Sequence, residues 1–232
     1  MTNEYPYRYE PHCHTSQTSA CGRMTGAELA RFYKNHGYTG IIVTDHFFNG
    51  NTTVPRTGMS WEARVDMFMR GYEDARMEGE RIGLDVFFAW EYTYNTNDFL
   101  TYGLGRDWLL ENPDCCDIYP DEYFERVRTS GGFVVQAHPF RERDYVRMLC
   151  LFPRWVFAAE TDNAADPELF NERARMFAGS YSLLQTSGSD LHELKDRHRL
   201  AGVDSSVRFR TASDYPEALK AGNCVPFSLT LD

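Results

Sequence analysis

The sequence predicts an α/β fold in which strands and helices alternate within a single domain spanning residues 1–232. Short runs rich in β-branched and aromatic residues alternate with longer segments of helical periodicity almost from end to end. The 232 residues are 42% hydrophobic and 15% aromatic, which is enough to bury one core. Because seven or eight βα units in one domain favour a closed parallel sheet over an open one, we expect a TIM-like barrel.

Eight short apolar runs are expected to be strands, because each combines β-forming residues with polar or glycine-containing boundaries. They are residues 7–14, 40–44, 85–91, 99–104, 133–137, 156–160, 182–186 and 200–203. Residues 49–58 and 111–119 are rich in Asn, Thr, Pro and Asp and are expected to be loops.

The first two helices have clear boundary signals. Thr25 and Glu28 have the spacing of a capping box, and Gly37 marks the end of the first helix. Ser60 is expected to cap a second helix that runs to about Glu78, with apolar residues at three- and four-residue steps. Further helices are expected at residues 121–129, 167–178 and 214–221.

The formal net charge of −10 argues against a broad surface for binding duplex nucleic acid, which needs clustered cations. No run of about 18 apolar residues is present and the N-terminal residues lack the pattern of a signal peptide, so we expect no membrane contact and a cytoplasmic location. The six cysteines have no C-x-x-C spacing, and reduced thiols are expected. Nothing in the sequence specifies an oligomeric state.

A His-x-His pair closes the first expected strand. Side chains alternate across a strand, so His12 and His14 share one face while Cys13 points away. Two imidazoles on one face are able to hold one metal ion, although a single pair of this kind also occurs by chance.

Other potential metal ligands stand at the ends of other expected strands. They are Asp45 and His46 after residues 40–44, Glu91 after 86–90, His138 after 133–137, and Asp190 and His192 after 182–186. In a barrel the C-terminal strand ends share one rim, so these side chains are expected to converge there. Mixed imidazole and carboxylate ligands suit Zn²⁺, Mn²⁺ or Fe²⁺, and their number implies two or three ions.

The remaining two histidines have no such position. His36 lies in the last turn of the first helix, where a cation interacts favourably with the helix dipole. His198 lies in a charged loop, close enough to the last motif to contact a substrate, although a solvated loop residue is the other interpretation.

These motifs, in this order, resemble the PHP family, the polymerase and histidinol phosphatase domain. They read His12-Cys-His14-Thr15, Thr44-Asp-His46, Trp90-Glu91, Ala137-His138-Pro139 and Gly188-Ser-Asp190-Leu-His192. The resemblance spans about residues 9–193 and implies a distorted (β/α)₇ barrel with a trinuclear site and phosphoesterase activity.

Carried over by position, the resemblance implies a role for each ligand. His12, His14, Glu91 and Asp190 would hold one ion, Glu91 would bridge to a second ion with His138, and His46 and His192 would hold a third. Asp45 would orient a ligand, in support of catalysis.

Two positions depart from the family pattern. Gln17, Ser19 and Cys21 stand where the family supplies another histidine or acidic ligand, which makes occupancy of the third site an open point, and Gln17 is assigned to substrate binding. Asp98 is the candidate ligand where many members have a histidine.

The clustered site suggests that a hydroxide bridging two ions attacks phosphorus in line. Arg141 and Arg143 follow His138 closely and are expected to clamp the phosphate, with Arg197 and Arg199 as further substrate-binding residues. For any one of them a surface salt bridge is the competing interpretation. The expected substrate is a small phosphorylated molecule, and a nucleic-acid end also fits.

Two other classes remain open. Amidohydrolases also open a barrel with His-x-His, but their two-metal form uses a carbamylated lysine at a strand end, and Lys34, Lys195 and Lys220 are not expected at such ends. A PHP-like domain retained as a non-catalytic binding module is the third class. Such modules tend to lose ligands, whereas this chain keeps nearly all of them.

Overall fold

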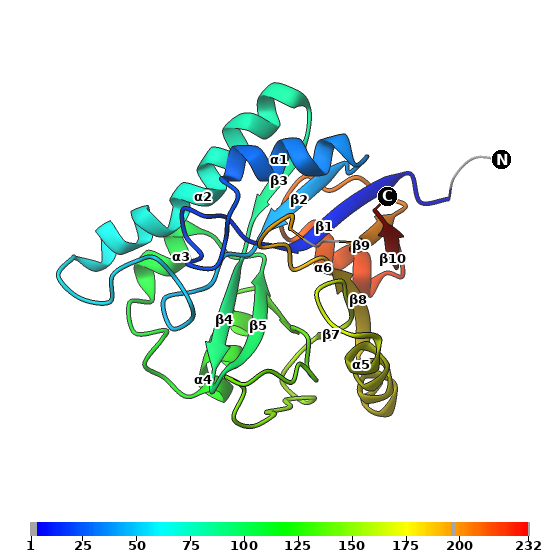
Figure 1. The fold of residues 1–232 in the computed structure, drawn as a ribbon. Helices are drawn as coiled ribbons and strands as arrows, with labels where there is room; N and C mark the ends of the chain where they lie inside the picture. The colour runs from blue at the N-terminus through cyan, green and yellow to red at the C-terminus, as the bar shows by residue number, and fades with distance from the viewer. Residues whose placement is uncertain (1–3, 196–197, 232) are drawn as a thin grey trace.

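The computed structural model describes residues 4–195 and 198–231, and within them the chain has a mixed α/β fold (Figure 1). The strands are β1 (Tyr7–Cys13), β2 (Gly40–Val43), β3 (Asp85–Phe88), β4 (Trp90–Tyr94), β5 (Asn97–Tyr102), β6 (Phe133–Gln136), β7 (Ala158–Asn163), β8 (Leu184–Gly188), β9 (Arg199–Ser205) and β10 (Cys224–Thr230). The helices are α1 (Gly26–Asn35), α2 (Trp61–Ile82), α3 (Arg106–Glu111), α4 (Pro120–Thr129), α5 (Glu168–Tyr181) and α6 (Asp214–Lys220). No helix among these residues is long and apolar enough to cross a bilayer.

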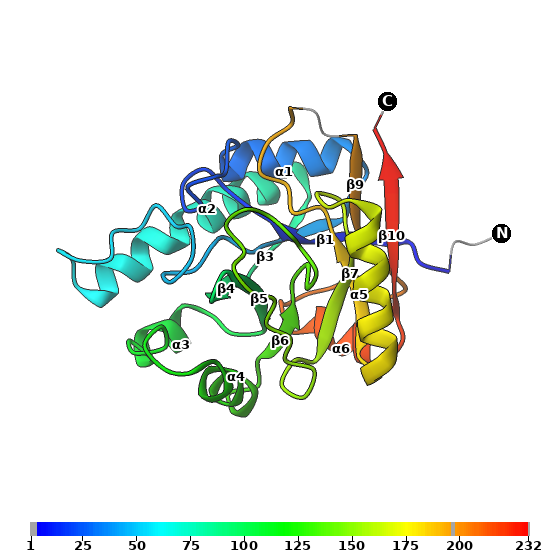
Figure 2. The same ribbon diagram turned by 60° about the horizontal axis from the view of Figure 1, so that its bottom comes forward.

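The strands form two five-stranded sheets, in the orders β10-β9-β1-β2-β3 and β4-β5-β6-β7-β8. The pairs β1–β2, β2–β3, β6–β7 and β7–β8 are parallel, as the βα pattern predicts. Figure 2 shows α5 alongside β7, and β9 and β10 side by side at the edge of the first sheet.

The two sheets adjoin at both ends. Ala89 alone separates β3 from β4, and a parallel bridge joins His46 to Glu91 just beyond it. On the other side a parallel bridge joins Cys13 to Leu191. Within the described residues these contacts do not complete a hydrogen-bonded barrel, so the closed barrel remains a prediction.

The expectation of an all-parallel sheet is wrong at β9, which pairs antiparallel with β1, and at β5. This strand pairs antiparallel with both β4 and β6. Only Asn95 and Thr96 separate β4 from β5, and both have positive φ, 48° and 62°. Two residues in this conformation make a hairpin turn, whereas a parallel connection needs a dozen residues or more.

Helix boundaries follow the capping signals closely. Thr25 and Glu28 form the expected capping box at the start of α1. Ser60 accepts a hydrogen bond from the Ala63 backbone N–H at 3.2 Å, which starts α2. This helix continues to Ile82 and ends at Gly83, whose φ of 71° allows the left-handed turn that stops it. The short α3 and the edge strand β10 were not expected from the sequence.

An aromatic core lies on one face of β4 and fixes the strand. Trp90 and Tyr92 are buried in it, and the Trp90 indole donates to the Tyr123 hydroxyl at 2.7 Å. Because side chains alternate across a strand, Glu91 points to the opposite face, into the interior between the two sheets. The packing of two large aromatic side chains therefore sets the direction of one buried carboxylate.

Candidate metal centre

The eight residues predicted as metal ligands come together at one end of the parallel strands. They are His12, His14, His46, Glu91, Asp98, His138, Asp190 and His192, and they form overlapping groups in which ligand atoms lie within 4.8 Å of one another. They come from the ends of β1, β2, β6 and β8 and from within β4 and β5. Residues 180 positions apart in the sequence thus share one cluster.

Glu91 is the centre of this cluster. Its Oε1 lies 3.2 Å from His12 Nε2 and 3.1 Å from His138 Nε2. Its Oε2 lies 2.7 Å from His46 Nδ1 and 3.4 Å from His14 Nε2. A carboxylate that faces imidazoles on both of its oxygens has the arrangement needed to bridge two ions.

A buried carboxylate sets the tautomer of His12. Glu160 Oε1 lies 2.9 Å from His12 Nδ1. An ionised carboxylate only accepts hydrogen bonds, so Nδ1 carries the proton and Nε2 keeps its lone pair toward the cluster. This carboxylate–histidine arrangement is typical of metal-binding imidazoles. Glu160 Oε2 also accepts from the His138 backbone N–H at 3.0 Å, so one residue positions two predicted ligands.

Asp45 acts on His14 through Ser19. The Ser19 hydroxyl lies 2.6 Å from Asp45 Oδ1, and it accepts from the His46 backbone N–H at 3.0 Å. Since the hydroxyl gives its one proton to Asp45, the contact of 3.1 Å with His14 must be a bond donated by Nδ1–H. His14 Nε2 therefore also keeps its lone pair toward the cluster. Asp45 lies where the resemblance assigns it, behind a ligand.

Two ligand residues hold unusual backbone conformations. His138 has φ 26° and Asp190 has φ 49°. Positive φ in residues other than glycine costs roughly 1–3 kcal/mol each and collects at functional sites. The fold therefore stores strain at the two strand ends that direct these side chains inward.

Several buried polar atoms of the cluster have no hydrogen-bond partner. They are His12 Nε2, His14 Nε2, His46 Nδ1 and Glu91 Oε2. Buried polar groups are nearly always satisfied, and these four atoms all face the cluster. Imidazole nitrogens and carboxylate oxygens of this kind are ligands for borderline divalent cations, so the residues present fit the metal ions that the motifs imply.

Charges within the cluster reinforce this fit. Burial opposes ionisation of Glu91, yet the adjacent His46 and His12 hold its pKa well below its usual value. Burial likewise opposes a charge on His12, but Glu160, Asp190 and Glu91 raise its pKa well above the usual value. The carboxylates thus favour a positive charge at this point, whether it comes from a proton or from a metal ion.

Asp98 lies at the edge of the cluster. Its Oδ2 is 4.0 Å from His138 Nε2, and its Oδ1 accepts from the Thr93 hydroxyl at 2.6 Å. Burial, followed by the charge of Glu91, raises the pKa of Asp98. Its distance to His138 places Asp98 next to the predicted ligands, where the sequence analysis expects a further one.

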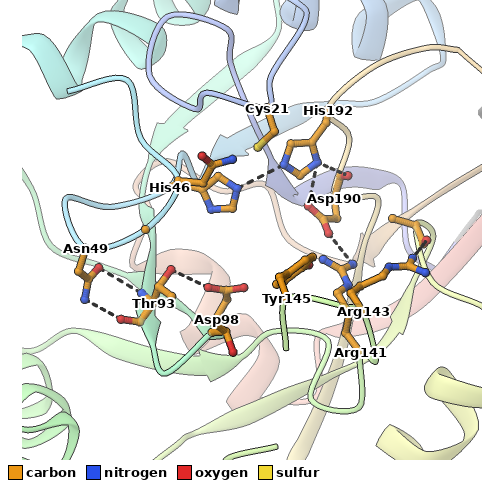
Figure 3. A pocket seen from close by; sticks show the side chains of 14 residues that line it. Cys21, His46, Asn49, Thr93, Asp98, Arg141, Arg143, Tyr145, Asp190 and His192 are labelled. Carbon is orange, nitrogen blue, oxygen red and sulfur yellow. Dashed lines mark hydrogen bonds and ion pairs between the residues drawn. The ribbon is translucent and has the colours of Figure 1, made fainter. Parts of the chain in front are cut away.

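A pocket of about 580 Å³ opens above the cluster (Figure 3). Arg141, Arg143 and Tyr145 line one side, and Asn49, Thr93 and Asp98 line the other. Its volume lies within the range that holds a small molecule.

The two predicted phosphate-binding arginines differ in how they are held. Arg141 is nearly buried, donating from Nε to Asp166 at 2.9 Å and from Nη2 to Asp190 at 2.6 Å. Arg143 is more exposed, with a side chain 41% accessible and a contact of 3.3 Å to Asp166. Both line the pocket, and the guanidinium of Arg143 is the more available of the two to a ligand.

The other predicted substrate contacts lie elsewhere. Gln17 uses both ends of its amide within the fold, donating to Asp74 at 2.7 Å and accepting from the Gly26 N–H at 3.0 Å. Arg199 forms an ion pair with Asp162. Arg197 lies outside the described residues. This geometry gives no support to substrate contacts by Gln17 and Arg199.

The two histidines without a strand-end position stay apart from the cluster. His36 Nδ1 hydrogen-bonds the Phe32 carbonyl at 2.8 Å, one helical turn earlier. His198 is exposed, next to the start of β9.

Two residues of the site were given no role from the sequence. Glu160 lies within β7 and is the last residue of the strand expected at residues 156–160, so it carried the same strand-end signal as the predicted ligands. Cys21 lines the pocket beside His46 and His192, and although burial opposes ionisation, these imidazoles lower the pKa of its thiol to about 6. It stands in the segment where the family pattern supplies a further ligand, but the sequence does not distinguish it there from Gln17 and Ser19.

Fold and site together define an α/β protein with a cluster of potential metal ligands at its strand ends. A scan of the sequence against family models gives no match, and neither does a search of curated proteins. Solved structures do match. A two-domain protein of Bacteroides vulgatus containing a predicted PHP-like metal-dependent phosphoesterase superposes with a TM-score of 0.71 at 14% identity, over 95% of this chain. This chain spans 64% of that protein.

Two further structures share the fold. One is a proposed metal-dependent phosphoesterase of Bifidobacterium adolescentis, with TM-score 0.52 and 17% identity over 81% of this chain and 88% of that one. The other is an amidohydrolase of Chromobacterium violaceum with bound sulfate and no metal, with TM-score 0.53 and 12% identity over 82% and 89%. The resemblance to PHP-like proteins is thus confirmed at the level of the fold.

Proposed function

We propose that this chain is a metal-dependent phosphoesterase that hydrolyses a small phosphomonoester. The observation that carries the proposal is the convergence of eight ligand residues around Glu91, with buried nitrogen and oxygen atoms that have no partner in the protein. Such a cluster needs cations, and cations at the floor of a pocket are suited to a negatively charged substrate.

The ligands divide into three groups. One ion would be held by His12, His14, Glu91 and Asp190, a second by Glu91, Asp98 and His138, and a third by His46 and His192. Divalent ions in these positions would supply Lewis acidity toward phosphoryl oxygens and would lower the pKa of a nearby water. Zn²⁺, Mn²⁺ and Fe²⁺ all suit these donors.

The protein's own contribution is to hold the ligands and to orient the substrate. Arg143 faces the pocket and would donate two hydrogen bonds to a phosphate group. Thr93 and Asn49, across the pocket, offer polar groups to the rest of the molecule. Arg141 would fix Asp190 through its ion pair while presenting its positive charge to the phosphate.

Pocket size and overall charge favour a small substrate. A volume of about 580 Å³ suits a molecule of metabolite size. The net charge of −10 disfavours tracking along a polynucleotide backbone, so a nucleic-acid end is the second choice within this class.

A solved amidohydrolase shares the fold, but the lysine of a two-metal amidohydrolase is missing from the cluster. Lys34 donates to the Gly83 carbonyl, and Lys220 lies over the Phe133 ring, 3.8 Å from its centre. Lys195 is exposed on the segment after His192. Glu91 takes the central position instead, which favours the phosphoesterase class.

The test combines metal analysis with turnover. Protein purified without chelator is expected to contain at least two divalent ions per chain and to hydrolyse an aryl phosphate faster when Mn²⁺ is added. Amides and lactones tested in parallel should give no turnover. Metal-loaded protein that is inactive on a broad phosphoester panel would contradict the proposal, and turnover of an amide or lactone would favour the amidohydrolase class.

A further inference from the structure

We propose that Cys21 is a metal ligand, and that with His46 and His192 it forms a mixed sulfur–imidazole site for a cation such as Zn²⁺ beside the carboxylate-rich site. The proposal rests on the proposed function in one respect, since both require that the cluster binds metal. It adds a ligand and a metal preference that the motifs do not assign.

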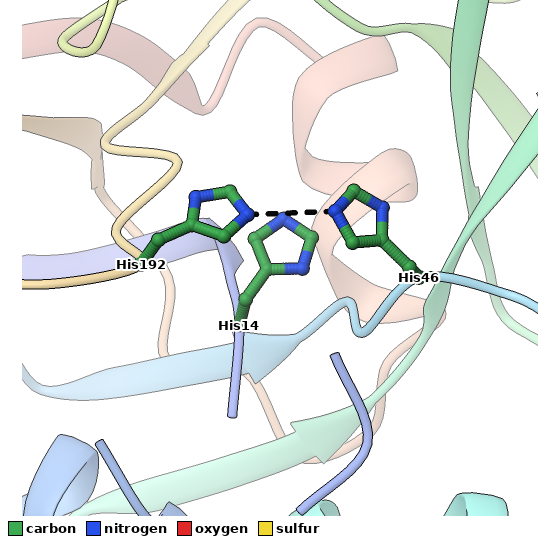
Figure 4. A group of neighbouring side chains, drawn as sticks. All are labelled: His14, His46 and His192. Atoms are coloured by element: carbon green, nitrogen blue, oxygen red, sulfur yellow. Dashed lines mark hydrogen bonds between the residues drawn. The ribbon is translucent and has the colours of Figure 1, made fainter. Parts of the chain in front are cut away.

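Three imidazole rings meet at this point (Figure 4). The rings of His14 and His192 stack with their centres 4.2 Å apart, and the centres of His14 and His46 are 4.5 Å apart. The Nε2 atoms of His46 and His192 are separated by 3.4 Å. Two imidazole nitrogens on one tetrahedral Zn²⁺ stand about 3.3–3.4 Å apart, given Zn–N bonds of about 2.0–2.1 Å. The observed spacing therefore matches a shared ion.

His14 lies at the border between this site and the first site, and its Nε2 indicates that cations belong at this end of the cluster. Its side chain is fully buried, and its Nε2 has no hydrogen-bond partner. The bond from its Nδ1–H to Ser19 leaves Nε2 with a lone pair that faces the other two rings. A buried lone pair of this kind needs a cation or a donor, and no donor is present among the described side chains around it.

Cys21 is held firmly next to these rings. On one side the Ala20 N–H donates to the Asn51 carbonyl at 2.9 Å, and on the other the Arg23 N–H donates to the His192 carbonyl at 2.8 Å. Its side chain lines the pocket together with His46 and His192, and Figure 3 shows the sulfur beside both imidazoles. Its segment is thus tied directly to the residue whose imidazole it faces.

The chemistry of the donors separates two kinds of site. Around Glu91, Asp98 and His138 most donors are oxygen, which suits harder ions such as Mn²⁺. Sulfur with imidazole nitrogen is the donor set of zinc sites, and Co²⁺ follows the same preference. We therefore expect Cys21 to give the His46–His192 site a selectivity for Zn²⁺ and Co²⁺ over Mn²⁺.

The absorption spectrum of the Co²⁺-substituted protein reports whether a thiolate binds the ion. Co²⁺ bound to a thiolate has an intense near-ultraviolet sulfur-to-cobalt charge-transfer band, whereas Co²⁺ bound only to nitrogen and oxygen lacks it. The full-length protein, freed of metal and titrated with Co²⁺, is expected to develop this band. Cys21→Ser should lose it, and Cys150→Ser, a control at another partly buried cysteine, should keep it.

A third variant distinguishes loss of the sulfur ligand from loss of metal binding by the whole site. Cys21→His replaces sulfur with an imidazole, so it should keep the number of bound Co²⁺ ions but lack the band. Cys21→Ala should bind the last Zn²⁺ ion at least ~10-fold more weakly, since even the loss of an outer partner of a metal ligand costs 10–100-fold in affinity.

The unmodified chain gives a test that needs no variant. Zn²⁺ should slow alkylation of Cys21 by iodoacetamide at least ~10-fold, through loss of the free thiolate, and should leave Cys150 unaffected when both are followed by peptide mass spectrometry. Cobalt bound without a charge-transfer band, a band that survives in Cys21→Ser, or equal alkylation rates would overturn the role of Cys21 alone. Failure to bind any Co²⁺ or Zn²⁺ would overturn the metal centre as well.

Discussion

Glu160 and His12 form a buried pair at the floor of the metal centre, with Oε1 2.9 Å from Nδ1 and both side chains almost inaccessible to solvent. The carboxylate fixes both the ring orientation and the tautomer, so that Nε2 faces Glu91. One residue without a motif of its own therefore determines whether the first histidine of the His-x-His pair is able to bind metal.

Removing Glu160 is expected to weaken metal binding. Glu160→Ala should reduce the affinity for the most tightly bound Zn²⁺ by about 10–100-fold, the usual effect of losing a partner behind a ligating histidine. Glu160→Gln keeps an acceptor oxygen for Nδ1–H and should lose less. Competition with a chelating dye measures both, and equal affinities in the wild type and Glu160→Ala would show that His12 does not depend on this contact.

Replacing Glu91 by Gln should remove at least one ion per chain. The Gln amide is neutral and is a poorer metal ligand than a carboxylate, so both of the sites that share Glu91 would bind their ions more weakly. We expect hydrolysis of an aryl phosphate to fall by at least ~100-fold, with the loss of metal measured by elemental analysis on the same sample. Asp107→Asn, on the short helix α3, is a control that should retain both metal and activity.

Chelation should lower thermal stability as well as activity. An ion that binds only the folded chain at a free concentration of 100 times its Kd adds about 2.7 kcal/mol to the free energy of unfolding. For a domain of this size that corresponds to a Tm change of roughly 5–10 °C. Scanning calorimetry with and without EDTA measures the shift, and Glu91→Gln should show a smaller one. An unchanged Tm in the wild type would mean that the purified chain carries no ion.

Alanine variants of Arg141 and Arg143 should differ in their effects on kinetics and on metal content. Arg143→Ala is expected to raise KM for an aryl phosphate with metal content unchanged, because its guanidinium is the more exposed of the two and contacts no predicted ligand among the described residues. Arg141→Ala should lower both metal content and kcat/KM, because it removes the partner of Asp190. An unchanged kcat/KM in Arg141→Ala would exclude both of its assigned roles.

Two glycines in helices should respond oppositely to alanine. In α2, a Cβ at Gly71 would overlap Thr15 Oγ1 and lie 2.8 Å from Asp45 Oδ2. Gly71→Ala should therefore destabilise the fold and weaken metal binding, although alanine favours helix by up to about 1 kcal/mol. In α5, a Cβ at Gly179 meets nothing within 4 Å, so Gly179→Ala should be neutral or stabilising. Urea denaturation of both variants checks the sign.

Sequence reasoning located the side chains that cluster in the structure, because strand ends are easy to recognise. Each apolar run that ends in His, Asp or Glu delivers that side chain to a common edge once the neighbouring strands are parallel, and His12, His138 and Asp190 needed no finer information. The alternation of β4 was equally readable, since Trp90 and Tyr92 flank Glu91.

What the sequence could not supply was the set of partners that come from distant segments. The ion pair between Arg141 and Asp190 spans 49 residues, and the contact between Glu160 and His12 spans 148. No local pattern specifies such pairs, because they depend on how the two sheets meet. The hairpin at Asn95 and Thr96 was missed for a different reason, since neither residue is the glycine that usually marks a tight turn.

The position of the ligands on so many separate strands also has a consequence inside a cell. A site assembled from residues 12 to 192 exists only when the chain is fully folded, so ions bound there would stabilise the native state against degradation. Scarcity of metal would then reduce the abundance of the protein itself, through faster proteolysis, before an inactive folded form accumulated.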